Sequence, residues 1–364
     1  FPAAKAWFQG WRLRDETYRR QTAMNRRQSD RHPTGTPTLI DVAKVAGVSP
    51  ITVSRALGRP ELVTDATRRR VLAAVRTTGY VPNLAAGSLA GRRSRLMAIF
   101  LPTIANSIFA DTVQALTDRL AEAGYQTLLG LTGYCPEQEQ ALLEAVLGRR
   151  PDGIVLTGTE HTQASRDCLA RVGIPVVEAW DLCERPLDML VGFSHEAVGR
   201  AVARYLLSKG YRRVSVVSID DPRGLRRCCS LIEAMAEQGA DPIAMEVLPA
   251  PATVAVGRQG FCRLLERNAA GDVVVCSSDT VAQGVLAEAA SRGLSVPEHL
   301  AVMGFGDLSS AAHSHPTLTT VRVDGARIGR TIAEALLARI AEPGQARAPL
   351  RLDVGFELIV RDST

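Results

Sequence analysis

The side chains best suited to do chemistry lie in a short stretch after Ser49. One expected helix has an apolar face, and its other positions hold Ile51, Thr52, Ser54 and Arg55. Small hydroxyl groups, an aliphatic group and a guanidinium can all approach base edges and phosphates without steric conflict. This set of residue types therefore indicates contact with a nucleic acid, made from one side of a helix.

The residues before this stretch predict a first helix that supports it. Thr38 and Asp41 form a capping-box-like start, in which a short acidic side chain takes the place of the usual Glu or Gln. Gly47 suits the left-handed residue that ends a helix. Apolar residues recur between them at helical spacing and predict one buried face, formed by Leu39, Val42, Val45 and Ala46.

A second and a third helix complete the expected head. Ser49 is a good N-cap, and Pro50 suits the first position of a helix over residues 50–57. A third helix is expected from Thr64 to a stop at Gly79. Helix, glycine-containing turn and helix form the helix-turn-helix arrangement, although any small three-helix bundle with solvated charges fits the same spacing.

The charge balance favours the DNA-binding alternative. Residues 1–95 hold 18 Lys and Arg against 6 Asp and Glu, a net charge of +12, and the remaining 269 residues hold 25 against 32, a net charge of −7. A basic head on an acidic body is typical of a protein with a polyanionic partner. Membrane-surface binding is disfavoured, because no expected helix has a large apolar face opposite its arginines.

Several motifs in order resemble one family. LIDVAKVAGVS, TVSRALG, GYVPN and AAGSLAG match the head of the lactose-repressor (LacI/GalR) family of bacterial transcription regulators, and a weaker match continues from Pro37 through nearly the whole chain. The resemblance implies a homodimer, with a tetramer also open, that binds double-stranded operator DNA in the cytoplasm. Repression by effector-controlled DNA release is the implied mechanism, while co-repression and activation stay open.

The resemblance also implies which residues contact DNA. Pro50, Ile51 and Arg55 match the readers of the major groove, and Asn83 matches the cap of a hinge helix over residues 83–90. Ala86 would lie near the floor of the minor groove, and Leu89 would enter a base step as a wedge. The full implied set is Leu39, Ser49, Pro50, Ile51, Thr52, Ser54, Arg55, Asn83, Ala86 and Leu89.

The body alternates short β-branched runs with helical stretches, which predicts parallel sheets covered by helices on both faces. Its length predicts two lobes, and the resemblance is to the periplasmic sugar-binding fold. The expected strands are 97–101, 126–131, 153–156, 175–177, 214–219, 273–276 and 301–305, and the expected helices include 109–123, 137–147, 197–208, 225–238 and 281–292. The expected domains are an extension and basic arm (1–36), a helix-turn-helix domain (37–81), a hinge and linker (82–95) and an effector-binding and dimerisation domain (96–364).

Ligands of open α/β sheets bind beyond the carboxyl ends of the strands, so effector contacts are expected there. Arg227 matches an arginine that holds the ligand in the family, although the Gly-Phe that usually follows is absent. Asp279 is expected to be a helix N-cap beside Ser278. The candidate effector residues are Phe109, His161, Glu178, Arg223, Arg227, Ser278 and Gly306.

Gly306 indicates the class of effector. Many sugar-binding relatives carry an acidic residue at this position, and its loss beside Arg227 and Arg223 makes the cleft more tolerant of an anion. LTGTEHT, IPVVEAWD and VGFSHEA also resemble the gluconate-utilisation branch of the family. The predicted effector is gluconate or a related keto- or phosphorylated sugar acid, with a neutral sugar as the alternative.

Other function classes find little support in the sequence. The seven cysteines form no metal-binding spacing, no cofactor loop or catalytic motif is present, and no apolar run is long enough to cross a bilayer. An exported sugar-binding protein would share the body but lack the head. A sugar-acid enzyme would need paired carboxylates or a cofactor loop. Residues 1–23 match nothing in the family, and Met24 is the expected natural start.

Overall fold

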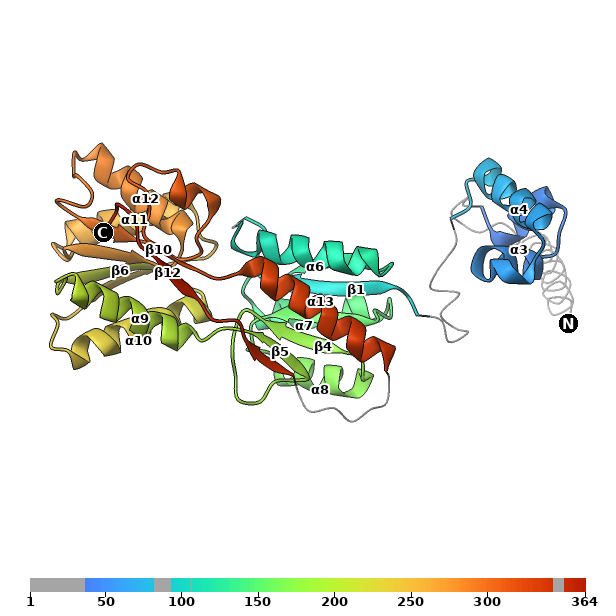
Figure 1. The fold of residues 1–364 in the computed structure, drawn as a ribbon, viewed down its shortest axis with the longest axis horizontal. Coiled ribbons are helices and arrows are strands. Elements are labelled where there is room, and N and C mark those ends of the chain that lie inside the picture. The colour runs from blue at the N-terminus through green and yellow to red at the C-terminus, as the bar shows by residue number, and fades with distance from the viewer. Residues whose placement is uncertain (1–36, 82–92, 106, 343–349) are drawn as a thin grey trace, which may run out of the picture. The chain divides into compact units, whose positions relative to one another are not determined.

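The computed structural model describes residues 37–81, 93–105, 107–342 and 350–364. The chain forms two compact units, Phe1–Gly87 and Ser88–Thr364, and each is described by itself (Figure 1). Among the described residues, no helix is both long enough and apolar enough to cross a membrane.

The first unit is a helical head whose ends are fixed by capping groups. Thr38 and Asp41 form a capping box, in which the Asp41 carboxylate accepts from the Thr38 backbone N–H at 2.8 Å. Gly47 takes the left-handed conformation with φ of 62°, and Ser49 Oγ accepts from the Thr52 N–H at 3.2 Å. The elements are α2 (Leu39–Ala46), α3 (Pro50–Gly58), η1 (Pro60–Leu62) and α4 (Asp65–Thr78).

The core of the head is small and built from short side chains. Val42, Val53 and Val71 are fully buried at the meeting point of α2, α3 and α4. Val45 was expected on the same face of α2 but is 56% exposed, because the three-helix contact is narrow and Ala43 takes the inner position instead. The head therefore holds α3 with one face buried and the other free.

The first lobe of the second unit is a six-stranded parallel sheet in the order β11-β5-β4-β3-β1-β2. Its strands are β1 (Leu96–Leu101), β2 (Gln126–Leu131), β3 (Gly153–Thr157), β4 (Val176–Ala179), β5 (Met189–Gly192) and β11 (Arg351–Asp353). Its helices are η2 (Ser107–Phe109), α6 (Ala110–Glu122), α7 (Pro136–Leu147), α8 (Gln163–Val172) and α13 (Gly325–Ala341).

Strand β1 shows how helices cover both faces of this sheet. Met97 and Ile99 join the cluster that includes α6 and α13, whereas Ala98 and Phe100 join the cluster that includes α7 and α8. Both sets are buried, so the strand forms a continuous apolar run, as expected for a doubly covered parallel strand. Figure 1 shows α6 and α13 side by side on one face.

The second lobe repeats this design with four parallel strands in the order β7-β6-β8-β9. Its strands are β6 (Val214–Ile219), β7 (Ala244–Leu248), β8 (Val273–Cys276) and β9 (Ala301–Met303). Its helices are α9 (His195–Ser208), α10 (Pro222–Glu237), α11 (Val254–Glu266), α12 (Asp279–Ser291) and η3 (Ser309–Ala312). Strands β10 (Thr320–Arg322) and β12 (Glu357–Ile359) pair with each other as a two-stranded antiparallel ribbon.

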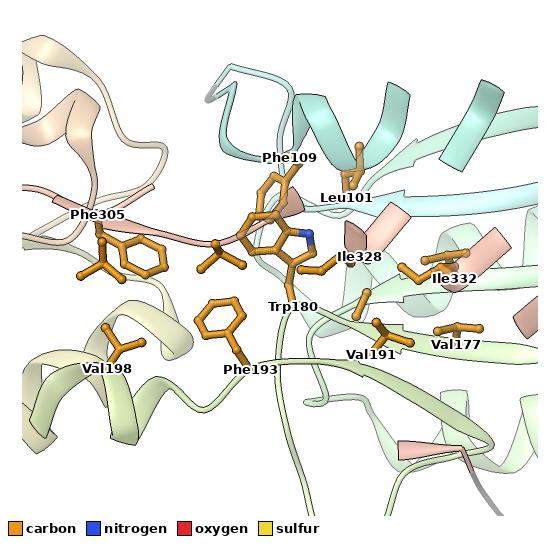
Figure 2. Packing of buried hydrophobic residues seen from close by; sticks show 14 of the residues in the cluster. Leu101, Phe109, Val177, Trp180, Val191, Phe193, Val198, Phe305, Ile328 and Ile332 are labelled. Atoms are coloured by element: carbon orange, nitrogen blue, oxygen red, sulfur yellow. The ribbon is translucent and has the colours of Figure 1, made fainter. Parts of the chain in front are cut away.

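The chain passes between the lobes three times, at residues 193–194, 323–324 and 354–356. Phe193 and Val323 lie on two of these crossings and belong to one buried cluster that continues from the first lobe into the second (Figure 2). The predicted fold class, parallel sheets flanked by helices in two lobes behind a helix-turn-helix head, is confirmed.

Candidate functional site

The outer face of α3 presents the predicted DNA-contacting side chains. Ile51 is 65% exposed, and Ser54 and Arg55 are exposed beside it. Val53 and Ala56 on the opposite face are buried and fix the rotation of the helix. An apolar group and a guanidinium one turn apart on a free helix face suit the major groove.

Two hydroxyl groups stabilise the start of the same helix. Ser49 Oγ lies 2.9 Å from Thr52 Oγ1 and also accepts from the Thr52 backbone. Pro50 is exposed, and Leu39 is half-buried against the head core. The three predicted hinge contacts, Asn83, Ala86 and Leu89, lie outside the described residues.

The second unit holds a cleft between its lobes, beyond the carboxyl ends of their strands. Phe109 and Trp180 come from the first lobe, and Arg227 and Phe305 come from the second. Of the predicted effector residues, this compartment brings together Phe109, Arg223, Arg227 and Ser278.

Aromatic rings form one wall of this compartment. Phe109 meets the face of Trp180 edge-on, with ring centroids 5.1 Å apart, and Trp180 meets Phe193 at 5.9 Å (Figure 2). Trp180 Nε1 donates to Thr112 Oγ1 at 3.1 Å, which anchors the indole on α6. The wall is therefore rigid and apolar, suited to the carbon skeleton of a ligand.

Arg227 is buried, and most of its donors are already satisfied. Its guanidinium carbon lies 3.7 Å from the centroid of the Phe305 ring, and Nη2 donates to the Ser277 carbonyl at 2.9 Å. Nη1 lies 2.9 Å from His195 Nδ1. Burial lowers the pKa of Arg227 to about 10, so the side chain is still charged at neutral pH.

His195 accepts from Arg227 as a neutral imidazole. Burial, followed by the charge of Arg227, holds the pKa of His195 well below its ordinary value. Its Nε2 lies 2.9 Å from the Trp180 carbonyl, which fixes the tautomer with the proton on Nε2. The positive charge of Arg227 is therefore not cancelled by its nearest titratable neighbour.

Arg223 provides the unsatisfied donor of the cleft. Its Nε and Nη2 donate to Asp221 Oδ1, both at 3.2 Å, and its guanidinium lies 5.6 Å from the centre of the Phe109 ring. Arg223 is only 8% exposed, and its buried Nη1 has no hydrogen-bond partner among the described residues. A buried charged donor without a partner is costly, so this atom is a strong candidate for contact with an anion.

The other predicted effector residues lie elsewhere. His161 Nδ1 lies 2.6 Å from Glu139 Oε1, and its Nε2 lies 3.3 Å from Glu178 Oε1, so the two predicted residues pair with each other and not with the compartment lining. Burial alone would lower the pKa of His161, but the two carboxylates outweigh it and raise that pKa to about 9. Gly306 has φ of 127° and lies against Ile108 and Asp279, outside the compartment lining.

One predicted cap is wrong. Ser278, not Asp279, is the N-cap of α12, and its Oγ accepts from the Val281 N–H. Asp279 follows as the first helical residue, and its buried carboxylate accepts from Thr320 Oγ1 at 2.6 Å and from the Leu308 N–H at 2.7 Å. The carboxylate therefore joins α12 to the strand β10 instead of closing the helix end.

The cleft residues that the sequence interpretation missed include Tyr134, Trp180, His195 and Asp221. Trp180 directly follows β4 and Asp221 lies two residues after β6, positions that could have marked them. The presence of His195 and Tyr134 in the cleft depends on how the two lobes pack against each other, which no local sequence pattern predicts. No group of three His, Cys, Asp or Glu side chains that could hold a metal ion occurs among the described residues.

Two family models match the chain. The model described as bacterial regulatory proteins of the lacI family matches residues 38–83, which include the helical head. The model described as a periplasmic binding protein-like domain matches residues 203–364.

Similar proteins cover almost the same length. The HTH-type transcriptional regulator GntR of Pseudomonas aeruginosa is 39% identical over 333 residues, which cover 91% of this chain and 96% of that protein. The regulator of the same name from Escherichia coli K12 is 33% identical, covering 88% of this chain and 97% of that protein. A crystal structure of a LacI family transcriptional regulator from Silicibacter pomeroyi is 34% identical with a TM-score of 0.84, covering 90% of this chain and 99% of that one.

Proposed function

Because the chain belongs to the LacI family of bacterial regulatory proteins, we propose that it represses genes of sugar-acid catabolism under the control of an acidic effector. The similar proteins are transcriptional regulators, and this chain is likewise a DNA-binding transcriptional regulator and not an enzyme. The effector is gluconate or a related keto- or phosphorylated sugar acid, and its binding in the cleft changes the affinity for operator DNA.

The buried, unpartnered Nη1 of Arg223 is the observation that carries the effector class. Arg227 adds a second charge to the same compartment, and its neighbour His195 is neutral. A carboxylate at this place would accept charge-assisted hydrogen bonds, whereas a neutral sugar would leave the charges uncompensated. Phe109 and Ser278 complete the contacts that we assign to the effector.

The DNA side of the proposal follows the exposed face of α3. Pro50, Ile51 and Arg55 read base pairs in the major groove, and Ser49, Thr52, Ser54 and Leu39 hold the backbone or support the reading helix. We assign Asn83, Ala86 and Leu89 to a hinge helix that enters the minor groove, on the resemblance alone. We also propose that the protein works in the cytoplasm, where a bacterial regulator meets operator DNA.

A homodimer is proposed because operator DNA offers two half-sites to two heads. Strand β2 is an edge of the six-stranded sheet, and its Leu129 and Leu131 are 48% and 45% exposed. Apolar side chains on an open edge favour coverage by a second copy. Sedimentation of the full chain distinguishes the dimer from a tetramer.

The test is salt-dependent binding of the full chain to a fluorescent fragment of its own promoter, with and without gluconate. We expect specific binding that falls steeply with salt and changes when gluconate is added. Calorimetry with gluconate, 6-phosphogluconate, glucose and galactose then tests the effector. Tight binding of a neutral sugar without binding of any acid would refute the proposed effector class.

A further inference from the structure

The cleft continues past Arg223 into a second compartment with a different character. Arg223, Asp221 and Tyr134 line both compartments, so the two spaces adjoin each other. The first is walled by aromatic rings, and the second is polar. The polar side chains of the second compartment, apart from the three shared ones, are Thr132, Glu139, Thr157, Thr159, Glu160, Asp181 and Arg226.

The two compartments carry opposite charge. In the first, Arg223 and Arg227 face the single carboxylate of Asp221 beside a neutral His195, which leaves a net charge of +1. In the second, four carboxylates line the space together with Arg223 and Arg226, which leaves the lining with a net charge of −2, and one of the four, Glu139, is also paired with the protonated His161 outside the lining. The first compartment therefore attracts a single negative charge, and the second compartment repels a negative charge.

Both Nη atoms of Arg226 are already paired with carboxylates, and only its buried Nε has no hydrogen-bond partner among the described residues. Its Nη2 donates to Asp181 across the two lobes, and its Nη1 lies 3.7 Å from Glu196 Oε1. Asp181 is nearly fully buried and also accepts from Thr159 Oγ1 at 3.0 Å. An anion in the second compartment would have to compete with two carboxylates for this guanidinium.

The second compartment instead offers partners for hydroxyl groups. Carboxylates such as Asp221 accept from sugar hydroxyls. The hydroxyls of Thr132 and Thr159 already donate to the Leu101 carbonyl and to Asp181, so their oxygens can accept from a ligand as well. Burial, followed by the charge of Asp221, raises the pKa of Tyr134 to about 12, so its phenol keeps its proton and can donate. Alternating donors and acceptors of this kind suit a polyhydroxylated chain.

From this polarity we propose that the cleft selects a monoanionic aldonate and discriminates against acids with a second negative charge. The carboxylate lies against Arg223 and Arg227, and the hydroxylated chain extends into the second compartment. This inference rests on the proposed sugar-acid effector and narrows it. A phosphate or second carboxylate at the far end would meet Glu160 and Asp181, and Arg226 beside them is already paired through both Nη atoms with Asp181 and Glu196.

Calorimetry of the full chain with D-gluconate, D-glucarate, 6-phosphogluconate and D-glucose tests the inference. We expect gluconate to bind at least about tenfold more tightly than either glucarate or 6-phosphogluconate, which both carry a second acidic group. If glucarate and 6-phosphogluconate both bind as tightly as gluconate, the inference is overturned and the proposed function stands. If no acid binds and glucose does, the proposed function itself fails.

A charge-neutralising variant locates the discrimination. Glu160 is exposed at the second compartment, and Glu184 is exposed outside both compartments, so Glu160→Gln and Glu184→Gln remove the same charge from different places. We expect Glu160→Gln to tighten 6-phosphogluconate binding roughly two- to fivefold, the contribution of an exposed charge pair, with little change for gluconate. Equal effects of the two variants, or no effect of Glu160→Gln, would overturn the assignment to this compartment.

Discussion

Replacement of Arg223 by methionine tests the effector site most directly. The substitution keeps an unbranched side chain that can pack on the Phe109 ring but removes the buried Nη1 donor. Asp221 loses its partner, yet its Oδ2 still accepts from the Gly224 N–H at the start of α10. The lobe should therefore fold, and the main loss should fall on effector binding.

The magnitude follows from one hydrogen bond to a charged group. Such a bond contributes about 1.5–3 kcal/mol, which corresponds to a rise in the Kd for gluconate of roughly 10- to 150-fold. Arg227 is expected to keep part of the affinity, since its charge remains in the same compartment.

Calorimetry with gluconate measures the loss, and thermal unfolding of the same samples shows whether the body is intact. Arg200→Met serves as the matched control, because Arg200 is exposed on α9 and lines neither compartment. An Arg223→Met protein that binds gluconate as tightly as the unaltered chain would show that the anion lies elsewhere.

Three further predictions concern pH, capping and DNA. The pKa of His161 is raised from 6.5 to about 9 by its pairing with Glu139 and Glu178, so the stability that this pairing contributes should be fully present below pH 6.5 and lost as pH rises through 9. Urea unfolding at several pH values should show this loss of stability, and the His161→Gln variant should no longer show it. Ser49→Ala removes the N-cap of α3 and should lower the stability of the head by about 1 kcal/mol, measured by circular dichroism on heating, whereas an unchanged melting temperature would show that Pro50 suffices. Arg55→Met should weaken operator binding by about 1–3 kcal/mol while leaving most binding to random duplex, and equal loss on both DNAs in an anisotropy titration would reassign Arg55 to phosphate contact.

The head could be predicted in detail because its structure is encoded locally. Capping box, left-handed glycine and N-terminal proline each act within four residues, and all three occur where the sequence places them. Val45 shows the limit of this reasoning. Helical spacing identifies an apolar face, but the width of the contact with the neighbouring helices decides which of its members are buried.

The body was predicted less completely for a similar reason. All seven expected strands are present, but five others, β5, β7, β10, β11 and β12, were missed. Strand β7 carries the charged Glu246 inside its short apolar run. Glu246 is tolerated there since it pairs with the distant Arg267. Three helices, α8, α11 and α13, were also left out of the expected set.

The candidate site divides along the same line. Arg227 was assigned from the resemblance to the family and Arg223 from its place near Arg227, and both lie on α10, which follows β6. His161 and Glu178 were expected to face the effector, but His161 instead pairs with Glu139 of α7 and with Glu178 in a buried cluster. That pairing depends on tertiary packing, and nothing in the motifs around His161 indicates it.

The path of the chain through the first lobe has a consequence for its synthesis. Strand β11 and helix α13 belong to this lobe, yet both come after every strand of the four-stranded sheet in the sequence. On the ribosome, β5 therefore stays an open edge until residue 353 has emerged, whereas β6 to β9 can already pair. The second lobe also needs the end of the chain, because Val302 in β9 bonds to Ser363, so neither lobe can be completed before the last residues have been made.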